Sequence, residues 1–227
     1  MEAPFHAKEA GPDATERSKK LSMLYNLFRA TAAIRLKRED AEPSEIVPGL
    51  FLGSIGAALD REGLQKRGIT HVLCAAGDIK PMHPGFFRYL CLNVKDSPTE
   101  NLSQHFLKSH TFIREGRTAG AVLVHCFAGK SRSTTVVAAF LILELRMTLA
   151  GALALIRDLR PVAEPNPGFL LQLRALERVA SRKPDPLAAC VETSEEFTAA
   201  PRRAACAESK EGYERDKPEG AITTENG

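Results

Sequence analysis

Apolar and polar positions divide the chain into a patterned central region and two polar ends. Between residues 44 and 180, short apolar runs alternate with segments whose apolar residues recur every three or four positions. The short runs predict strands, and the segments of helical period predict helices. Strands that alternate with helices are typical of an α/β domain with a largely parallel sheet. The pattern therefore predicts a single α/β domain, in which a central, mostly parallel sheet of about five strands is flanked by helices.

The expected elements can be placed to within a few residues. Strands are predicted at 46–54, 70–76, 89–94 and 121–126, the first being a strand pair broken at Pro48-Gly49. Helices are predicted at 59–67, 102–117, 131–146, 148–160 and from 167 onward. Thr148 and Asn166 precede the last two helices and are expected to cap them, since short polar side chains accept hydrogen bonds from the first free amides. In the helix at 102–117, we expect Phe106, Leu107 and Ile113 on one side, and the helix at 131–146 is expected to have one apolar face.

The two ends differ from this central domain of residues 44–180. An extension of residues 1–43 contains a segment, 17–38, with seven basic residues, no acid, and apolar residues at helical spacing. It predicts a basic amphipathic helix. The apolar stripe can pack onto the central domain, lie on an anionic membrane surface or fill a calmodulin-like groove. From residue 181 to 227 the apolar period stops, which predicts a disordered tail.

Composition narrows the classes of protein. The 227 residues carry a net charge of only +3, which gives no indication of nucleic-acid binding. Five cysteines form no C-x-x-C pair, which argues against a disulfide framework or a zinc site, so no metal is expected. No apolar run is long enough for a transmembrane helix, and acidic residues near the start argue against a signal peptide. We expect a cytoplasmic or nuclear protein with reduced thiols, and a monomer by default.

One segment combines residues that suit phosphate chemistry: His125-Cys126-Phe127-Ala128-Gly129-Lys130-Ser131-Arg132-Ser133. A predicted strand ends at its cysteine and a predicted helix begins at its end, so the backbone N–H groups of residues 127–131 can form an anion nest at a helix N-terminus. Arg132 can bind two phosphate oxygens through its planar guanidinium. Cys126, at the base of this positive field, is expected to attack phosphorus as a thiolate. Gly129 permits a turn that a Cβ would obstruct.

The sequence HCFAGKSRS resembles the signature of the cysteine-dependent protein phosphatases, and specifically that of their dual-specificity branch. The run IVPGLFLGS at 46–54 resembles the opening strand pair of that branch, and Asn166-Pro167-Gly168-Phe169 resembles its closing element. Only 43 residues precede the likeness, and no tyrosine-recognition loop of the deep-pocket tyrosine phosphatases is found. The resemblance implies an atypical dual-specificity phosphatase without a metal, whose shallow cleft accepts phosphotyrosine, phosphoserine and phosphothreonine in phosphoprotein substrates.

The resemblance also implies roles for single residues. Cys126 corresponds to the nucleophile that forms a cysteinyl-phosphate, and Arg132 to the phosphate-binding arginine. Ser133 matches the hydroxyl that stabilises the thiolate when it leaves in the second step. His125 and Asn166 are expected to support the site.

A phosphatase of this kind also needs a general acid, because an alkoxide or phenoxide leaves poorly without a proton. The family places this acid on a loop some thirty residues before the cysteine. Asp96 lies thirty residues before Cys126 and follows the strand predicted at 89–94. Asp78, on the loop after the strand predicted at 70–76, is the alternative.

Two other functions and one form of regulation stay open at this point. Lys130 together with the basic segment suits a phosphoinositide phosphatase of the same superfamily. A non-catalytic phospho-binding module is less favoured, because the nucleophile, the arginine and the acid are all present. Cys74 and Cys91 are expected to pack in the core, although either can in principle form a reversible disulfide with Cys126.

Overall fold

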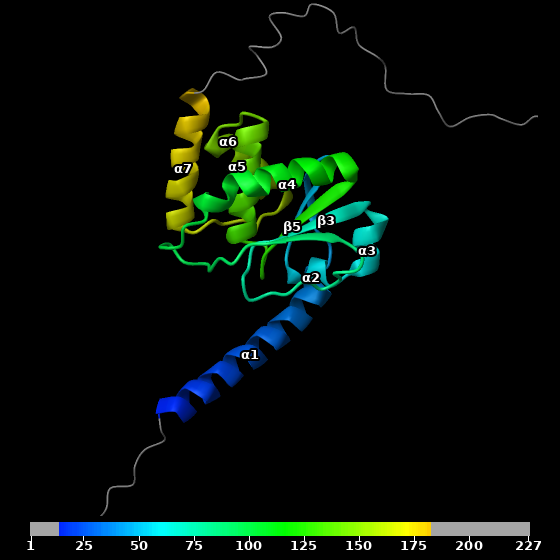
Figure 1. Ribbon diagram of the computed structural model, residues 1–227, viewed down its shortest axis with the longest axis vertical. Coiled ribbons are helices and arrows are strands. Elements are labelled where there is room, and N and C mark those ends of the chain that lie inside the picture. Colours follow the sequence, from blue (N-terminus) through cyan, green and yellow to red (C-terminus); the bar gives the residue numbers. More distant parts are fainter. Residues whose placement is uncertain (1–13, 183–227) are drawn as a thin grey trace, which may run out of the picture. The chain divides into compact units, whose positions relative to one another are not determined.

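The computed structural model describes residues 14–182, which form a five-stranded sheet with helices around it (Figure 1). The strand order is β1-β2-β5-β3-β4. The bounds are Ser44–Val47 for β1, Leu50–Gly53 for β2, Ile69–Cys74 for β3, Arg88–Cys91 for β4 and Ala121–His125 for β5. Only β1 and β2 pair antiparallel, and the other three pairs are parallel. The predicted α/β fold with a mostly parallel sheet is confirmed.

The helices follow the predicted order, with differences at particular residues. Their bounds are Ala14–Glu39 for α1, Ile55–Ala58 for α2, Arg61–Lys66 for α3, Phe106–Ala119 for α4, Arg132–Glu144 for α5, Leu149–Leu159 for α6 and Pro167–Arg182 for α7, with a 3-10 turn η1 at Ser103–His105. Thr148 caps α6 by accepting a hydrogen bond from Gly151 N, and Asn166 caps α7 by accepting one from Phe169 N, as predicted. The helix predicted at 59–67 is α3, which begins two residues later because Asp60 caps it by accepting a hydrogen bond from Gly63 N. The short helix α2 before it was not predicted.

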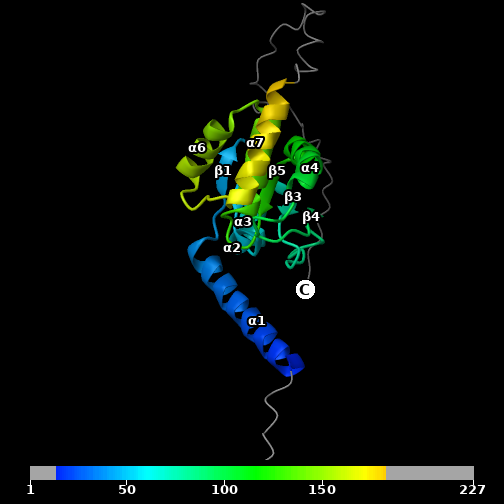
Figure 2. The same ribbon diagram turned by 90° about the vertical axis from the view of Figure 1, so that its left-hand side faces the viewer.

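The two faces of the sheet pack against different helices. Val122 and Val124 of β5 belong to the larger core, which includes residues of α4, α5, α6 and α7. Leu123, between them in sequence, points to the opposite face and packs with Leu64 of α3. Figure 2 shows α7 between α6 and α4 on the side of the larger core.

Two predictions about helix faces are wrong. Ten of the thirteen residues of α5 are buried, rather than one apolar face, because α4, α6 and α7 all contact this helix. Leu107 on α4 is 72% exposed, whereas Phe106 and Ile113 are buried as expected.

The segment 17–38 is helical, as predicted, but its basic and apolar residues interleave around the helix, so the predicted separation into an apolar and a basic face is wrong. Most of its large apolar side chains do not pack onto the central domain. Leu21, Leu24 and Ile34 are 64–70% exposed. Of the apolar residues of this segment, only Ala33 and Leu36 pack against the larger core. Residues 181 and 182, predicted to begin the tail, are the end of α7, and the rest of the tail lies outside the described residues. Among residues 14–182, no helix is both long and apolar enough to span a bilayer.

Candidate active site

The predicted phosphate cradle lies where β5 ends and α5 begins. Residues 126–131, which we call the cradle loop, connect His125 at the end of β5 to Arg132 at the start of α5. Cys126 is 1% exposed, at the beginning of this loop. The hydroxyl of Ser133 donates a hydrogen bond to Cys126 Sγ at 3.2 Å. A hydroxyl donor at that sulfur can stabilise its thiolate form.

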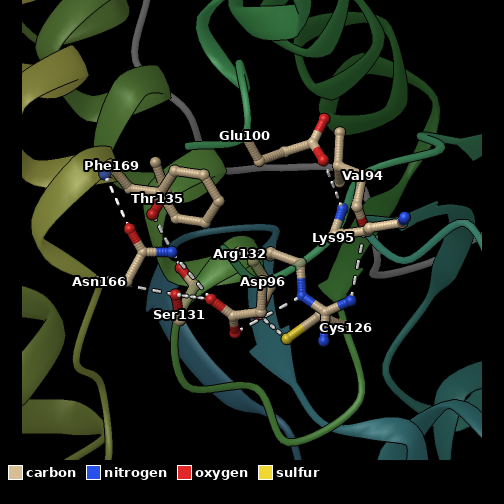
Figure 3. A network of polar contacts seen from close by, with 11 residues as sticks. Val94, Lys95, Asp96, Glu100, Cys126, Ser131, Arg132, Thr135, Asn166 and Phe169 are labelled. Atoms are coloured by element: carbon tan, nitrogen blue, oxygen red, sulfur yellow. Dashed lines mark hydrogen bonds and ion pairs between the residues drawn. The ribbon is translucent and has the colours of Figure 1, made fainter. Parts of the chain in front are cut away.

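Arg132 lies next to Cys126, and its guanidinium does not use all of its N–H donors (Figure 3). Its Nη1 donates to the carbonyl of Val94 at 3.5 Å, and its Nε lies 3.6 Å from Asp96 Oδ2. The Nε is buried and makes no hydrogen bond to any described residue. A buried guanidinium N–H without an acceptor is costly, and a phosphate oxygen would supply the missing acceptor.

Asp96 faces the same space, and neighbouring side chains fix the orientation of its carboxylate (Figure 3). Its Oδ1 accepts hydrogen bonds from Ser131 Oγ at 2.7 Å and from Asn166 Nδ2 at 2.9 Å. Glu100 steadies the same loop by accepting a hydrogen bond from Lys95 N at 3.3 Å. Because both side-chain bonds fall on Oδ1, Oδ2 remains directed at Arg132 and available for proton transfer.

Asp78, the alternative acid, makes its contact with a different arginine from the one beside Asp96. Its carboxylate forms an ion pair with Arg29 of α1. Both aspartates line the same cleft, but only Asp96 lies beside Arg132. The geometry therefore favours Asp96 as the proton donor.

His125 supports the cradle loop from beneath. Its ring is fully buried and its Nδ1–H donates to the carbonyl of Cys126 at 3.0 Å. Burial lowers the pKa of His125 to about 4, so the imidazole is neutral near pH 7. The ring therefore holds the backbone at Cys126 without adding charge.

The sequence did not reveal Arg160 and Asp40, which brace the outer side of the cradle loop. Arg160 Nε donates to Gly129 O at 2.8 Å, and its Nη2 donates to Ala128 O at 3.1 Å. The same guanidinium makes a bidentate pair with Asp40, with bonds of 3.0 and 2.7 Å. Gly129 has φ +65°, and a Cβ there would lie 2.5 Å from Gly53 O. The carbonyls of the loop are thus fixed by Arg160, which leaves its amides free for an anion.

Arg160→Met is expected to lower the free energy of unfolding by about 3 kcal/mol, because it leaves a carboxylate and two carbonyls without their donor. Arg160→Lys keeps the charge but cannot make all four bonds, so we expect roughly a tenfold loss of kcat/KM at a smaller cost in stability. Urea unfolding and steady-state kinetics measure the two effects. Arg157→Lys, in the last turn of α6, is the control, and equal behaviour of the two lysine variants would contradict the bracing role.

Lys130 does not direct its side chain to the cradle. Its Nζ forms an exposed ion pair with Glu164 Oε2 at 2.6 Å. Phosphate binding by the Lys130 side chain therefore stays a prediction that this contact does not support. Lys130 was the residue of the cradle loop that favoured a phosphoinositide substrate, and its contact with Glu164 does not support that alternative.

Cys74 and Cys91 occupy register positions opposite each other on β3 and β4. Cys74 is buried as expected, but Cys91 is exposed, so the expectation that both pack in the core is wrong for Cys91. Cys74 lies opposite His125 on β5. Burial raises the pKa of Cys74 to about 12, so this thiol is protonated near neutral pH and exchanges slowly. A disulfide between either residue and Cys126 stays a prediction.

Comparison with known proteins identifies the family. Residues 50–179 match the sequence model described as dual specificity phosphatase, catalytic domain. The chain belongs to the dual specificity phosphatase family. It is 44% identical over 153 residues to dual specificity protein phosphatase 1 of Arabidopsis thaliana, an alignment that covers 67% of this chain and 77% of that protein. It is 41% identical over 136 residues to dual specificity protein phosphatase 22 of Homo sapiens, covering 60% and 73%.

Solved structures agree with this assignment. The crystal structure of human DUSP28 superposes with a TM-score of 0.59 at 35% identity, covering 61% of this chain and 95% of that one. The human tyrosine phosphatase-like serine/threonine/tyrosine-interacting protein gives 0.58 at 39% identity, covering 60% and 96%. This dual specificity phosphatase is therefore an atypical member of the protein tyrosine phosphatase superfamily and a protein phosphatase.

Proposed function

We propose that this phosphatase hydrolyses phosphotyrosine and phosphoserine or phosphothreonine in proteins through a cysteinyl-phosphate on Cys126. The observation that carries the proposal is the convergence of Cys126, Arg132 and Asp96 at one strand-to-helix loop. In the first step the Cys126 thiolate attacks phosphorus while Arg132 and the loop amides bind the equatorial oxygens. The bond from phosphorus to the substrate oxygen breaks, and that oxygen takes a proton from Asp96.

The second step returns the enzyme to its starting state. Asp96, now a carboxylate, takes a proton from water, and the water oxygen attacks phosphorus. The phosphorus–sulfur bond breaks, and inorganic phosphate leaves. The Ser133 hydroxyl, 3.2 Å from the sulfur, stabilises the departing thiolate.

Phosphate release from a mixed panel tests this function. The panel contains phosphotyrosine peptides, phosphothreonine peptides and phosphoinositides, with Cys126→Ser as the blank. We expect release from both kinds of peptide and little from the lipids. A strong preference for lipids would favour the phosphoinositide alternative, and failure to hydrolyse even a small aryl phosphate would favour a phospho-binding module.

We also propose the cytoplasm or nucleus as the location, on the basis of the three free cysteines among residues 14–182, and a monomeric state. Cell fractionation with an antibody to the chain tests the location, and gel filtration with light scattering tests the oligomeric state. Recovery in a secretory compartment, or a dimer at micromolar concentration, would contradict these proposals.

We infer that helix α1 binds an acidic, calmodulin-like groove rather than a membrane surface. Its exposed apolar side chains complement such a groove, and so do its six basic residues other than Arg29, which pairs with Asp78. Lys20 lies four residues before Leu24, and therefore shares a face with it. Basic and apolar positions thus interleave around the helix, whereas a membrane-surface helix segregates them.

Titration of the full chain with calcium-loaded calmodulin, and separately with vesicles containing phosphatidylserine, tests this partner. We expect saturable binding to calmodulin that falls roughly tenfold in Leu24→Ala/Ile34→Ala. Leu171→Ala, an exposed leucine on α7, is the matched control. Binding to vesicles alone would overturn the proposal in favour of a membrane.

A further inference from the structure

Helix α1 supplies one wall of the catalytic cleft. The cleft has a volume of about 550 Å³ and is lined by Asp96, Arg132 and the cradle-loop residue Phe127. Tyr25, Phe28 and Arg29 of α1 line the same cleft. The sequence placed these three residues in the N-terminal extension, outside the predicted catalytic domain. Their position gives the extension a part in the space that a substrate enters.

Arg29 holds this part of α1 against the cleft through its contacts with Asp78 and Phe127. Its side chain is only 19% exposed, although large apolar side chains along the same helix are more than half exposed. The guanidinium pairs with Asp78 and lies 5.0 Å from the centre of the Phe127 ring and 5.7 Å from that of Tyr25. A cation placed over aromatic rings at these distances is attracted to both. Arg29 therefore links Tyr25 to the residue that follows the nucleophile.

We propose that Tyr25, Phe28 and Phe127 form an aromatic wall that contacts the phenyl ring of phosphotyrosine, so that the enzyme prefers phosphotyrosine to phosphothreonine. The proposal rests on the proposed function and names its favoured substrate. Arg132 and the cradle loop fix the phosphate, so the group bonded to it must pass Phe127. A phenyl ring offers a broad apolar surface and a favourable edge-to-face or stacked contact to such a wall. The short side chain of phosphothreonine offers neither.

The experiment compares kcat/KM of the full chain for two peptides that differ only in phosphotyrosine or phosphothreonine. In Tyr25→Ala/Phe28→Ala we expect the ratio of the two values to fall roughly tenfold, through loss on the phosphotyrosine peptide. Phe28→Leu keeps an apolar side chain without a ring and is expected to give an intermediate ratio. Met23→Ala, an exposed residue of α1 outside the cleft, is expected to leave the ratio unchanged. Circular dichroism verifies that α1 remains helical in each variant.

The results of this comparison test the aromatic wall separately from the proposed phosphatase function. An unchanged ratio in the double variant, or an equal loss on both peptides, would overturn the wall while the phosphatase activity stands. A wild-type ratio near one would also overturn it. Absence of hydrolysis of either peptide by the wild-type chain would instead refute the proposed function itself, and the wall with it.

Discussion

Cys126→Ser is expected to lower kcat by a factor on the order of 10⁴ to 10⁶, while the variant still binds phosphopeptides. The hydroxyl of serine is a far weaker nucleophile than a thiolate. Among residues 14–182, no histidine makes a hydrogen bond to the side chain at position 126 and could act as its base, since the ring of His125 bonds to the Cys126 carbonyl. The two atoms differ little in size, and Arg132 and the cradle loop do not depend on the sulfur for their contacts. Phosphate binding should therefore survive the loss of the chemical step.

Stopped assays with a phosphotyrosine peptide measure the rate, and fluorescence anisotropy of the labelled peptide measures binding. Cys91→Ser is the matched control, because this cysteine is exposed on β4 and outside the cleft. It is expected to stay near the wild-type rate. Turnover by Cys126→Ser within tenfold of wild type would refute a covalent mechanism at this residue, and loss of binding along with turnover would point to collapse of the cradle.

The parts of this site that the sequence predicted are local. A buried strand, a short loop and a helix follow each other within the segment 121–144. Most neighbours of Cys126 are therefore close to it in the sequence and can be predicted from it. The caps at Thr148 and Asn166 were predictable for the same reason, since a cap acts on amides two or three residues away. The distance of thirty residues between Asp96 and Cys126 became informative only through the family resemblance.

The parts that the sequence missed depend on contacts between distant segments. Arg160 and Asp40 are separated by 120 positions, and nothing in either neighbourhood shows that they pair across the cradle loop. The pattern for α5 indicated one apolar face, because periodicity cannot show that three further helices surround it. Lys130 has the charge of a phosphate ligand, but its side chain pairs with Glu164, which lies beyond both α5 and α6 in the sequence.

The same limit explains why the sequence could not show that α1 reaches the catalytic cleft. Its charge and apolar spacing are visible in the sequence, and both the structure and the sequence agree that it is a helix. Its contact with the site passes through Arg29, whose partners Asp78 and Phe127 lie on two other loops. A segment can therefore carry a partner surface and a wall of the cleft at once, and variants of Leu24 and of Phe28 separate these two roles.

Asp96→Asn is expected to lower kcat by 10² to 10⁴, roughly the contribution of general acid catalysis, with a loss that depends on the leaving group. Asparagine can keep the hydrogen bonds from Ser131 and Asn166 through its carbonyl oxygen, so the loop should remain in place. It has no proton to give to the leaving oxygen. An alkyl phosphate such as phosphothreonine needs that proton more than an aryl phosphate with an acidic phenol does.

The pH profile provides a second, independent readout. In the wild-type enzyme, kcat/KM should rise as Cys126 ionises and fall as Asp96 loses its proton, which gives a bell shape. In Asp96→Asn the descending limb should disappear while the ascending limb stays. Asp158→Asn, an exposed aspartate of α6, is expected to keep both limbs and the wild-type rate.

Asp78→Asn distinguishes the two candidate acids. Because Asp78 pairs with Arg29 rather than lying beside Arg132, its removal should disturb the wall of the cleft and leave the descending limb intact. If instead the descending limb persists in Asp96→Asn and vanishes in Asp78→Asn, the proton comes from the loop after β3. The contact of 3.6 Å between Asp96 and Arg132 would then serve to orient the arginine, and the acid would have to reach the leaving oxygen from the side of α1.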